Sequence, residues 1–118
     1  MNRLSMALDK LSLVFAALAD PTRRAILAAL ALGPMPVGEI AKPFAMSEPA
    51  VIKHLKVLER AGLVAADRKG QMRPRTLNPQ PLAEANVWVE QYRQHWEASF
   101  DRLDAYLQEI QAGEQNEL

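Results

Sequence analysis

A chain of 118 residues has room for one hydrophobic core, and its content of 49% apolar residues indicates a folded globule rather than a disordered chain. The absence of cysteine excludes disulfides, thiolate metal sites and cysteine redox sensing. The net charge is zero, but residues 42–75 contain eight Lys or Arg against three Asp or Glu, whereas residues 76–118 contain two against eight. This distribution indicates one surface for a polyanion and another that is kept away from it.

The first predicted element is an amphipathic helix over residues 3–19. Its apolar residues recur every three or four positions, and they are Leu4, Leu8, Leu11, Phe15 and Leu18. The run Leu11–Ala19 superficially resembles a secretory signal, but the charges of Asp9 and Lys10 lie directly before it and its stripe is helical. No stretch has the length of a transmembrane helix, so we expect a cytoplasmic protein with no membrane partner.

Two further helices are predicted before the middle of the chain. Asp20 is suited to cap the second helix and Pro21 to occupy its first position, and this helix should reach about Leu32. The glycine and two prolines of residues 33–36 end it. A short third helix is expected over about Val37–Pro43.

Residues 47–62 form the helix around which the chain is organised. The Ser47 hydroxyl can cap its N-terminus, Pro49 fits the first turn, where no N–H is needed, and Gly62 ends it. One side of this helix is predicted to be buried, because apolar residues recur there at helical spacing, namely Val51, Leu55, Leu58 and Ala61.

The opposite side of this helix is mostly basic. It carries Glu48, Ile52, Lys53, Lys56 and Arg60. A short helix with a buried back and a basic front has the form that lies in the major groove of DNA. An ordinary amphipathic surface helix has the same pattern, so the segments that follow must decide between the two interpretations.

After Gly62 the pattern indicates a β-hairpin. Short strands are expected at 63–65 and 75–77, with Gly70 in the connecting loop and Pro74 on an edge strand. Its polar residues, which we expect to contact phosphate or the minor groove, are Arg68, Lys69, Gln71, Arg73 and Arg75. Basic loop tips are often simply solvated, but here they follow a basic helix.

The longest predicted helix runs without interruption from Leu82 to about Ile110. Its apolar residues are close to a heptad pattern, and they are Val89, Tyr92, Trp96, Phe100, Leu103, Leu107 and Ile110. The last helix either folds back onto its own domain or pairs with a second copy. We favour a homodimer through both terminal helices, with an interface formed by Leu4, Leu8, Leu11, Phe15, Trp96, Phe100, Leu103 and Leu107. Residues 1–112 are predicted to form a single domain and residues 113–118 a flexible tail.

The predicted order is four helices, a β-hairpin and a long helix, and it looks like a mainly α winged helix-turn-helix. Four segments, Leu18–Leu27, Val37–Ala41, Met46–Val51 and His54–Val64, resemble the ArsR family of bacterial transcriptional repressors. The resemblance extends over about residues 12–108. It implies a dimeric winged helix that binds a palindromic operator, with Ser47–Lys56 as the face of the recognition helix and Arg68–Arg75 as the wing.

The chain departs from the family pattern at two places. Ile52 stands where the family commonly has a small polar residue; it cannot donate to a phosphate but can touch a thymine methyl. Metal-sensing members use cysteines, or Asp and His on the last helix, whereas this chain has no cysteine and only His95 there. We therefore expect no metal or other cofactor. The run Tyr92–Glu97 resembles the non-metal-sensing subgroup of the family.

The preferred function is that of a sequence-specific DNA-binding regulator, in the form of a repressor, and not an enzyme, because no catalytic arrangement or phosphate-binding loop is visible. One alternative is a winged-helix protein-interaction module with Ile52 in its docking patch. The other is a regulator that responds to a small ligand held between Trp88, Trp96 and the first helix. Arg23 and Arg24 either reach phosphate or pair with nearby acids. The predicted contacts with double-stranded DNA are Ser47, Glu48, Pro49, Ile52, Lys53, His54, Lys56, Arg68, Lys69, Gln71, Arg73 and Arg75.

Overall fold

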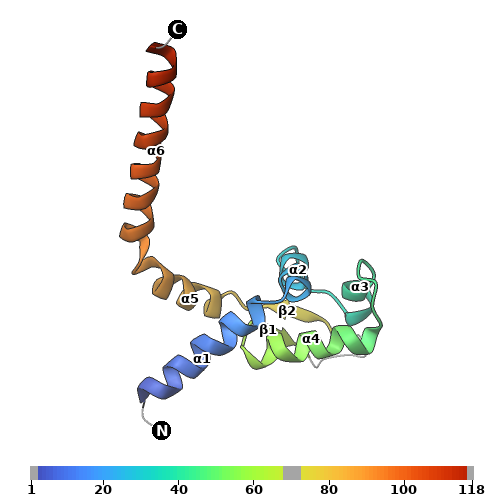
Figure 1. Cartoon of the computed structure of the whole chain (residues 1–118). Helices are drawn as coiled ribbons and strands as arrows, with labels where there is room; N and C mark the ends of the chain where they lie inside the picture. The colour runs from blue at the N-terminus through green and yellow to red at the C-terminus, as the bar shows by residue number, and fades with distance from the viewer. Residues whose placement is uncertain (1–2, 68–72, 117–118) are drawn as a thin grey trace. The chain divides into compact units, whose positions relative to one another are not determined.

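The computed structural model describes residues 3–67 and 73–116, with side chains described at 9–67 and 73–114. The chain divides into two compact units, Met1–Ala85 and Asn86–Leu118. The first unit contains α1 (Arg3–Leu18), α2 (Pro21–Leu30), α3 (Val37–Ala41), α4 (Glu48–Arg60), β1 (Val64–Ala66) and β2 (Arg75–Leu77) (Figure 1). Helix α5 (Gln80–Glu90) spans the boundary, and α6 (Arg93–Asn116) belongs to the second unit. The predicted fold class, mainly helical with one β-hairpin, is confirmed.

The predicted caps begin and end the helices of the first unit. The Asp20 carboxylate accepts the backbone N–H of Arg23 at 3.0 Å, and the Ser47 hydroxyl accepts that of Ala50 at 3.3 Å. Each cap residue is extended, and a proline stands in the first turn of each helix. Gly62 has a φ of +78°, which only glycine adopts readily, so it reverses the chain after α4. Helix α2 ends slightly before the predicted Leu32.

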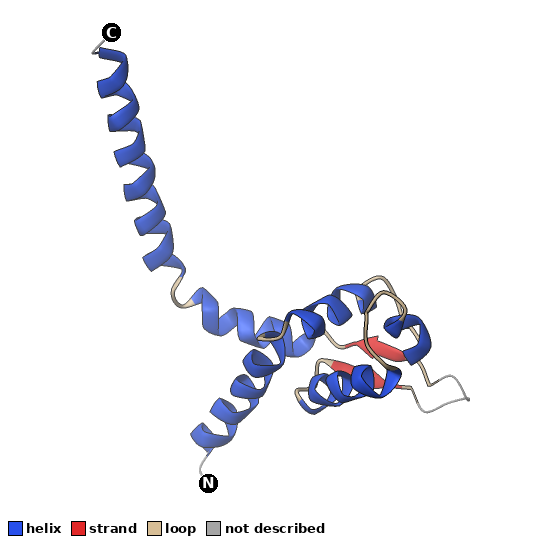
Figure 2. Cartoon of the chain, turned by 45° about the vertical axis from the view of Figure 1, so that its right-hand side comes forward, coloured by secondary structure: helices blue, strands red, loops and turns tan. Residues whose placement is uncertain are grey.

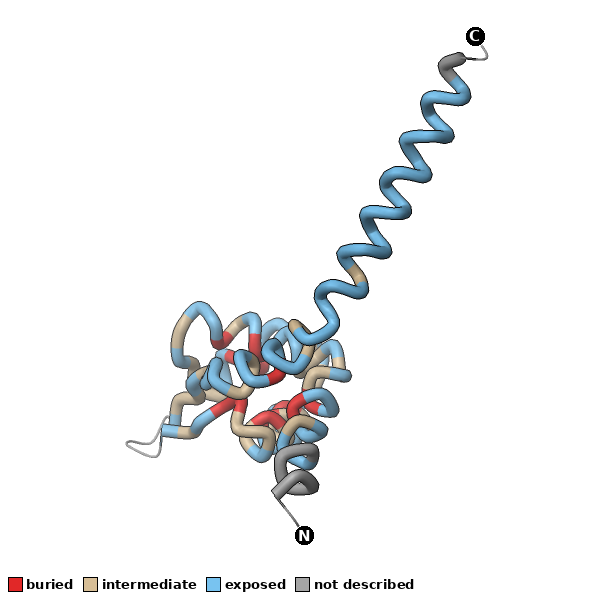
Figure 3. Tube along the Cα trace, turned by 90° about the vertical axis from the view of Figure 1, so that its left-hand side faces the viewer, coloured by how far each residue is buried: buried red, intermediate tan, exposed pale blue. Residues whose placement is uncertain are grey.

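The core of the first unit lies between α1, α2, α3, α4 and the hairpin. The apolar side of α4 is at its centre, with Val51, Leu55 and Leu58 fully buried, as the spacing predicted. Figure 3 shows the buried positions in red. The other buried residues are Val14, Ala17, Ile26, Leu27, Leu30, Ile40, Ala41, Leu63, Val64 and Ala85. The core is therefore built mostly on helix faces, and the hairpin closes one side of it.

The hairpin β1–β2, called the wing below, is antiparallel, with Ala65 opposite Thr76. A two-stranded hairpin is marginally stable in water, and here further contacts support it. β1 packs on α4 and β2 on α2 (Figure 2). Met35, between α2 and α3, also pairs with Arg75: each backbone N–H donates to the other residue's carbonyl, at 3.1 Å and 2.8 Å. The base of the wing is thus bonded to the α2–α3 connection.

The prediction of one uninterrupted helix from Leu82 to Ile110 is wrong. α5 ends at Glu90 and α6 starts at Arg93. At the break, the Tyr92 N–H donates to Val89 at 3.0 Å in a tight turn, and the Tyr92 carbonyl accepts the N–H of His95 at 3.0 Å. Neither proline nor glycine marks the break, so the sequence pattern did not show it.

The ends of the C-terminal helices also differ from the sequence pattern. α5 begins at Gln80, before the expected Leu82, and α6 continues to Asn116, which includes the beginning of the expected tail. Throughout the described part of the chain, none of the helices combines the length and the apolar character that crossing a membrane requires.

Candidate nucleic-acid interface

The outward side of α4 is the centre of the candidate site. Pro49, Lys53, Lys56 and Arg60 are exposed and lie opposite the buried stripe of this helix. Ile52 is partly buried at the edge of the same side. The helix thus presents cations, which attract phosphate, next to one apolar side chain. Ser47 and Glu48 are exposed at its N-terminus, where backbone N–H groups and the helix dipole also favour anions.

One flank of α4 is fixed to the wing by an ion pair. The Arg75 Nε donates to Glu59 Oε1 at 2.9 Å, and the Arg75 Nη1 donates to the Arg73 carbonyl at 2.6 Å. The Arg75 side chain is only 14% exposed. Arg75 was expected at the tip of the wing, but the structure uses it at the base, because the carboxylate of Glu59 in the last turn of α4 faces it. Arg73 is exposed, and Arg68, Lys69 and Gln71 lie outside the described residues.

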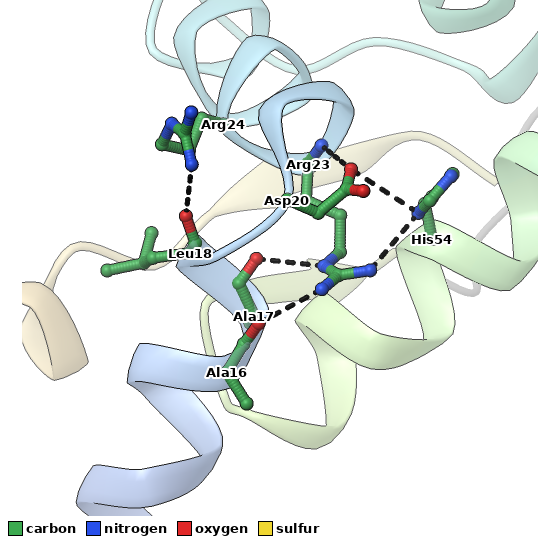
Figure 4. Close-up of polar contacts among 7 residues, drawn as sticks. All are labelled: Ala16, Ala17, Leu18, Asp20, Arg23, Arg24 and His54. Atoms are coloured by element: carbon green, nitrogen blue, oxygen red, sulfur yellow. Dashed lines mark hydrogen bonds and ion pairs between the residues drawn. The ribbon is translucent and has the colours of Figure 1, made fainter.

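The other flank of α4 contacts the junction of α1 and α2 through His54 (Figure 4). The His54 Nδ1 lies 3.4 Å from Arg23 Nη1 and 3.9 Å from Asp20 Oδ2. Arg23 also donates from Nε to the Ala17 carbonyl at 2.8 Å and from Nη2 to the Ala16 carbonyl at 2.9 Å. His54 is therefore engaged inside the domain and is not directed to a ligand.

The charge of Asp20 is stabilised in this junction. The backbone N–H of Arg23 has the largest effect and lowers the pKa of the Asp20 carboxyl below its ordinary value of 3.8. Partial burial opposes this shift in pKa, and the charges of Arg23 and His54 support it. Asp20 thus remains ionised near neutral pH, both as the cap of α2 and as a neighbour of His54.

The side chains of Arg23 and Arg24 both donate to main-chain carbonyls. Arg24 Nη1 donates to the Leu18 carbonyl at 2.7 Å, so both arginines bind carbonyl groups at the C-terminal end of α1. Phosphate or nearby acids were the expected partners of these two arginines, and this role was not predicted. A signal for it was present, because a cation in the first turn of α2 is unfavourable with the dipole of its own helix and so indicates a specific partner.

Comparison with known proteins agrees with this arrangement. A family model described as a helix-turn-helix domain matches residues 18–65. The transcriptional repressor SdpR of Bacillus subtilis is 41% identical over 76 residues, which are 64% of this chain and 84% of that protein. An ArsR family transcriptional regulator of known crystal structure has 39% sequence identity to this chain. The match covers 75% of this chain and 97% of that one, with a TM-score of 0.69.

The chain belongs to the ArsR family of transcriptional regulators. A solution structure of a homodimeric winged helix-turn-helix DNA-binding domain from Mycobacterium bovis is also similar, with 27% identity, a TM-score of 0.65, and coverage of 83% of this chain and 92% of that one. In this regulator α3 and α4 are the helix-turn-helix, and β1–β2 is the wing.

The residues expected at a dimer interface of the regulator have different environments. Leu11 packs partly against the core of its own unit, and Phe15 is 37% exposed. The side chains of Leu4 and Leu8 lie outside the described residues. Leu18 also packs against this core, and the fully buried positions of α1 are Val14 and Ala17, which the predicted stripe did not include. In α6, Trp96 is partly buried, and Phe100, Leu103 and Leu107 are exposed.

A metal centre was not expected in this regulator. Among the residues described by the structure, no three His, Cys, Asp or Glu side chains are grouped so that they could hold a metal ion. His95 is exposed on α6, and its ring lies 6.3 Å from that of Tyr92, measured between centroids.

Proposed function

We propose that the regulator is a repressor that binds a two-fold symmetric DNA operator as a homodimer, with α4 of each copy in the major groove. The exposed cations of α4, opposite its buried stripe, are the observation that carries this proposal. The proposed contacts are Ser47, Glu48, Pro49, Ile52, Lys53, Lys56 and Arg73, together with Arg68, Lys69 and Gln71 of the wing. His54 and Arg75 are left out because their side chains are engaged within the domain.

The homodimer is supported by the apolar residues of the second unit. Phe100, Leu103 and Leu107 are 64%, 53% and 48% exposed, and they follow one another at heptad spacing along α6. Figure 3 shows almost the whole of α6 as exposed. Such a stripe is costly in water and is covered economically by the same stripe of a second copy. The similar domain from Mycobacterium bovis is itself named homodimeric. Two copies of α4 about 34 Å apart would enter successive major grooves.

Repression would follow from occupancy, because a dimer seated across a promoter excludes RNA polymerase without any chemistry of its own. The Bacillus subtilis relative is named a transcriptional repressor, which supports repression rather than activation. The basic middle of the chain would bind the phosphates, and the acidic C-terminal segment would stay away from them.

The decisive experiment is selection of bound fragments from random DNA, followed by measurement of affinity at several salt concentrations. We expect an inverted repeat to be enriched and the affinity to fall steeply with salt. Lys53→Ala and Lys56→Ala should each weaken binding and reduce the salt slope by about 2, because each dimer loses two phosphate contacts. Lys10→Ala, which removes an exposed charge from α1, is the matched control and should change neither. No enriched sequence, or an affinity that ignores salt, would contradict the proposal.

Ile52 offers a test of base recognition. We propose that its side chain contacts a thymine methyl, the apolar feature of the major groove. Replacing that thymine by uracil should weaken binding of the wild-type protein by about three- to fivefold, the value of one buried methyl group. The same DNA change should have no effect on Ile52→Ser. Equal losses of affinity in both proteins would show that Ile52 does not contact this methyl group.

We also propose that operator binding does not respond to metal ions, as expected for the non-metal-sensing subgroup. The absence of cysteine and the isolated position of His95 support this. Affinity for the selected DNA should be the same with a chelator and with added Zn²⁺. A change of tenfold or more on addition of the metal would contradict it.

A further inference from the structure

We propose that Arg23 is a positioning residue that fixes the recognition helix α4 to the C-terminal end of α1, so that a displacement of α1 reaches the DNA-binding face. This inference rests on the proposed function, because it assumes that α4 binds DNA. In this proposal Arg23 does not contact DNA. It sets the orientation of α4, the helix that does.

The guanidinium of Arg23 joins two helices with all three of its nitrogens. Nε and Nη2 donate to the carbonyls of Ala17 and Ala16, at 2.8 Å and 2.9 Å, and Nη1 lies 3.4 Å from the Nδ1 of His54 (Figure 4). The two carbonyls belong to the last turn of α1, where the regular helical donors run out, although the Ala16 carbonyl also accepts the N–H of Ala19 at 3.2 Å. His54 is in the middle of α4. A single planar group therefore holds both the end of α1 and the flank of α4.

The position of Arg23 is explained by its partners and not by its own helix. It lies in the first turn of α2, where the helix dipole repels a cation, whereas the C-terminus of α1 attracts one. A guanidinium N–H can only donate, so in a hydrogen bond across this contact His54 Nδ1 is the acceptor. The Asp20 Oδ2 lies 3.9 Å from the same nitrogen of His54 (Figure 4).

This geometry makes α1 and α4 dependent on each other. If the end of α1 moves, its carbonyls move the guanidinium, and the contact with His54 must then stretch or carry α4 along. α1 is also one of the helices proposed to meet the second copy. The arrangement would thus let dimer contacts made by α1 influence the orientation of Lys53 and Lys56.

Lysine cannot replace arginine here. An ammonium is a point charge on a flexible stem, and it cannot hold two carbonyls and an imidazole in the fixed directions of a planar fork. Arg24 provides a matched control, because it also binds an α1 carbonyl but, among the described residues, makes no hydrogen bond to α4. Arg24→Lys therefore tests the effect of loosening the end of α1 without touching α4.

The test measures affinity for the selected DNA against salt for Arg23→Lys, His54→Ala, the double variant and Arg24→Lys. Circular dichroism first establishes that each protein is folded at the assay temperature. We expect Arg23→Lys and His54→Ala each to weaken binding by about three- to tenfold with an unchanged salt slope, and the double variant to be no weaker than the worse single one. Arg24→Lys should bind like the wild type.

Three results would overturn this inference. A salt slope reduced by about 2 in Arg23→Gln, which removes the charge from both copies of the dimer, would show that Arg23 itself contacts phosphate. Unchanged affinity of a folded Arg23→Lys or His54→Ala would show that the contact does not position α4. Effects that add in the double variant would show that the two residues act independently. Should Arg23→Lys fail to fold, His54→Ala decides, because it leaves the α1 carbonyls bound to Arg23.

The proposed function and this inference fail in different ways. If the wild-type protein binds no DNA, the proposed function is wrong, and the link between Arg23 and His54 is then judged from urea unfolding of the same four variants. Non-additive losses of stability for the Arg23 and His54 substitutions would retain the link, and additive losses would remove it.

Discussion

The ion pair between Glu59 and Arg75 joins the wing to α4, and its strength can be worked out from its burial. The Nε to Oε1 distance is 2.9 Å, and the side chains are 14% exposed for Arg75 and 31% for Glu59. An exposed pair contributes at most about 1 kcal/mol, whereas disrupting a buried pair costs about 3–5 kcal/mol. This partly buried pair lies between these limits, so we expect a coupling free energy of about 1–2 kcal/mol.

A double-mutant cycle isolates this coupling. Urea unfolding, followed by circular dichroism, gives the free energies of unfolding of the wild type, Glu59→Ala, Arg75→Ala and the double variant. The hydrogen bond from Arg75 to the Arg73 carbonyl is lost in both legs that change Arg75, so it cancels from the coupling. The backbone pairing of Arg75 with Met35 does not need the side chain and should persist in all four proteins.

An exposed pair within the same chain supplies the comparison. Arg93 Nη2 lies 2.8 Å from Glu90 Oε1, and the two side chains are 55% and 37% exposed, respectively. The same cycle on this pair should give a coupling free energy of less than about 0.5 kcal/mol, and this coupling should vanish in 1 M salt. The coupling of Glu59 and Arg75 should be mostly retained in 1 M salt. If the coupling of Glu59 and Arg75 is no larger than that of the exposed pair, the assignment of Arg75 to the base of the wing is refuted.

Three further predictions concern the core, the α2 cap and the second unit. Leu55→Ala removes a fully buried side chain from the centre of α4 and should lower the free energy of unfolding by about 2–5 kcal/mol, measured in urea; a loss below about 1 kcal/mol would contradict its place in the core. The pKa of Asp20 is lowered by the N–H of Arg23, so its stabilising effect should be complete above about pH 4 and disappear as the pH falls through the lowered pKa. Asp20→Asn keeps an acceptor for the cap but cannot titrate, so its melting temperature should fall less between pH 6 and pH 3 than that of the wild type, and equal falls would exclude this role. Phe100→Glu with Leu107→Glu places charges in the exposed stripe of α6 and should convert a dimer to a monomer in sedimentation; an unchanged mass would locate the interface elsewhere.

The sequence was sufficient for the helices of the first unit because their signals are local. Asp20 and Ser47 cap the helices that follow them, and Gly62 takes the positive φ that ends α4. The buried stripe of α4 repeats with the helical period, so its inward and outward sides follow from the sequence alone. The wing strands were found to within a residue or so for the same reason.

Partners that are distant in the sequence could not be predicted in this way. Arg75 is sixteen positions from Glu59 and was grouped with the other basic residues of the wing, because only the folded hairpin brings the two side chains together. Arg23 binds the end of α1 and the middle of α4, which a pattern read along one helix cannot show. The break at Tyr92 lacks proline and glycine, and the heptad-like stripe continues across it.

The bonds between Met35 and Arg75 have a consequence for how such a regulator can vary. They are made by main-chain atoms, so exchanging side chains in the α2–α3 connection would leave them intact, with the exception of Gly33, whose φ of +147° suits glycine. Adding or removing a residue there would instead shift the pairing partner of Arg75 and drag the hairpin with it. The connection is thus tolerant in composition but constrained in length, and insertions within it should be rejected even though it lies far from the cations of α4 in sequence.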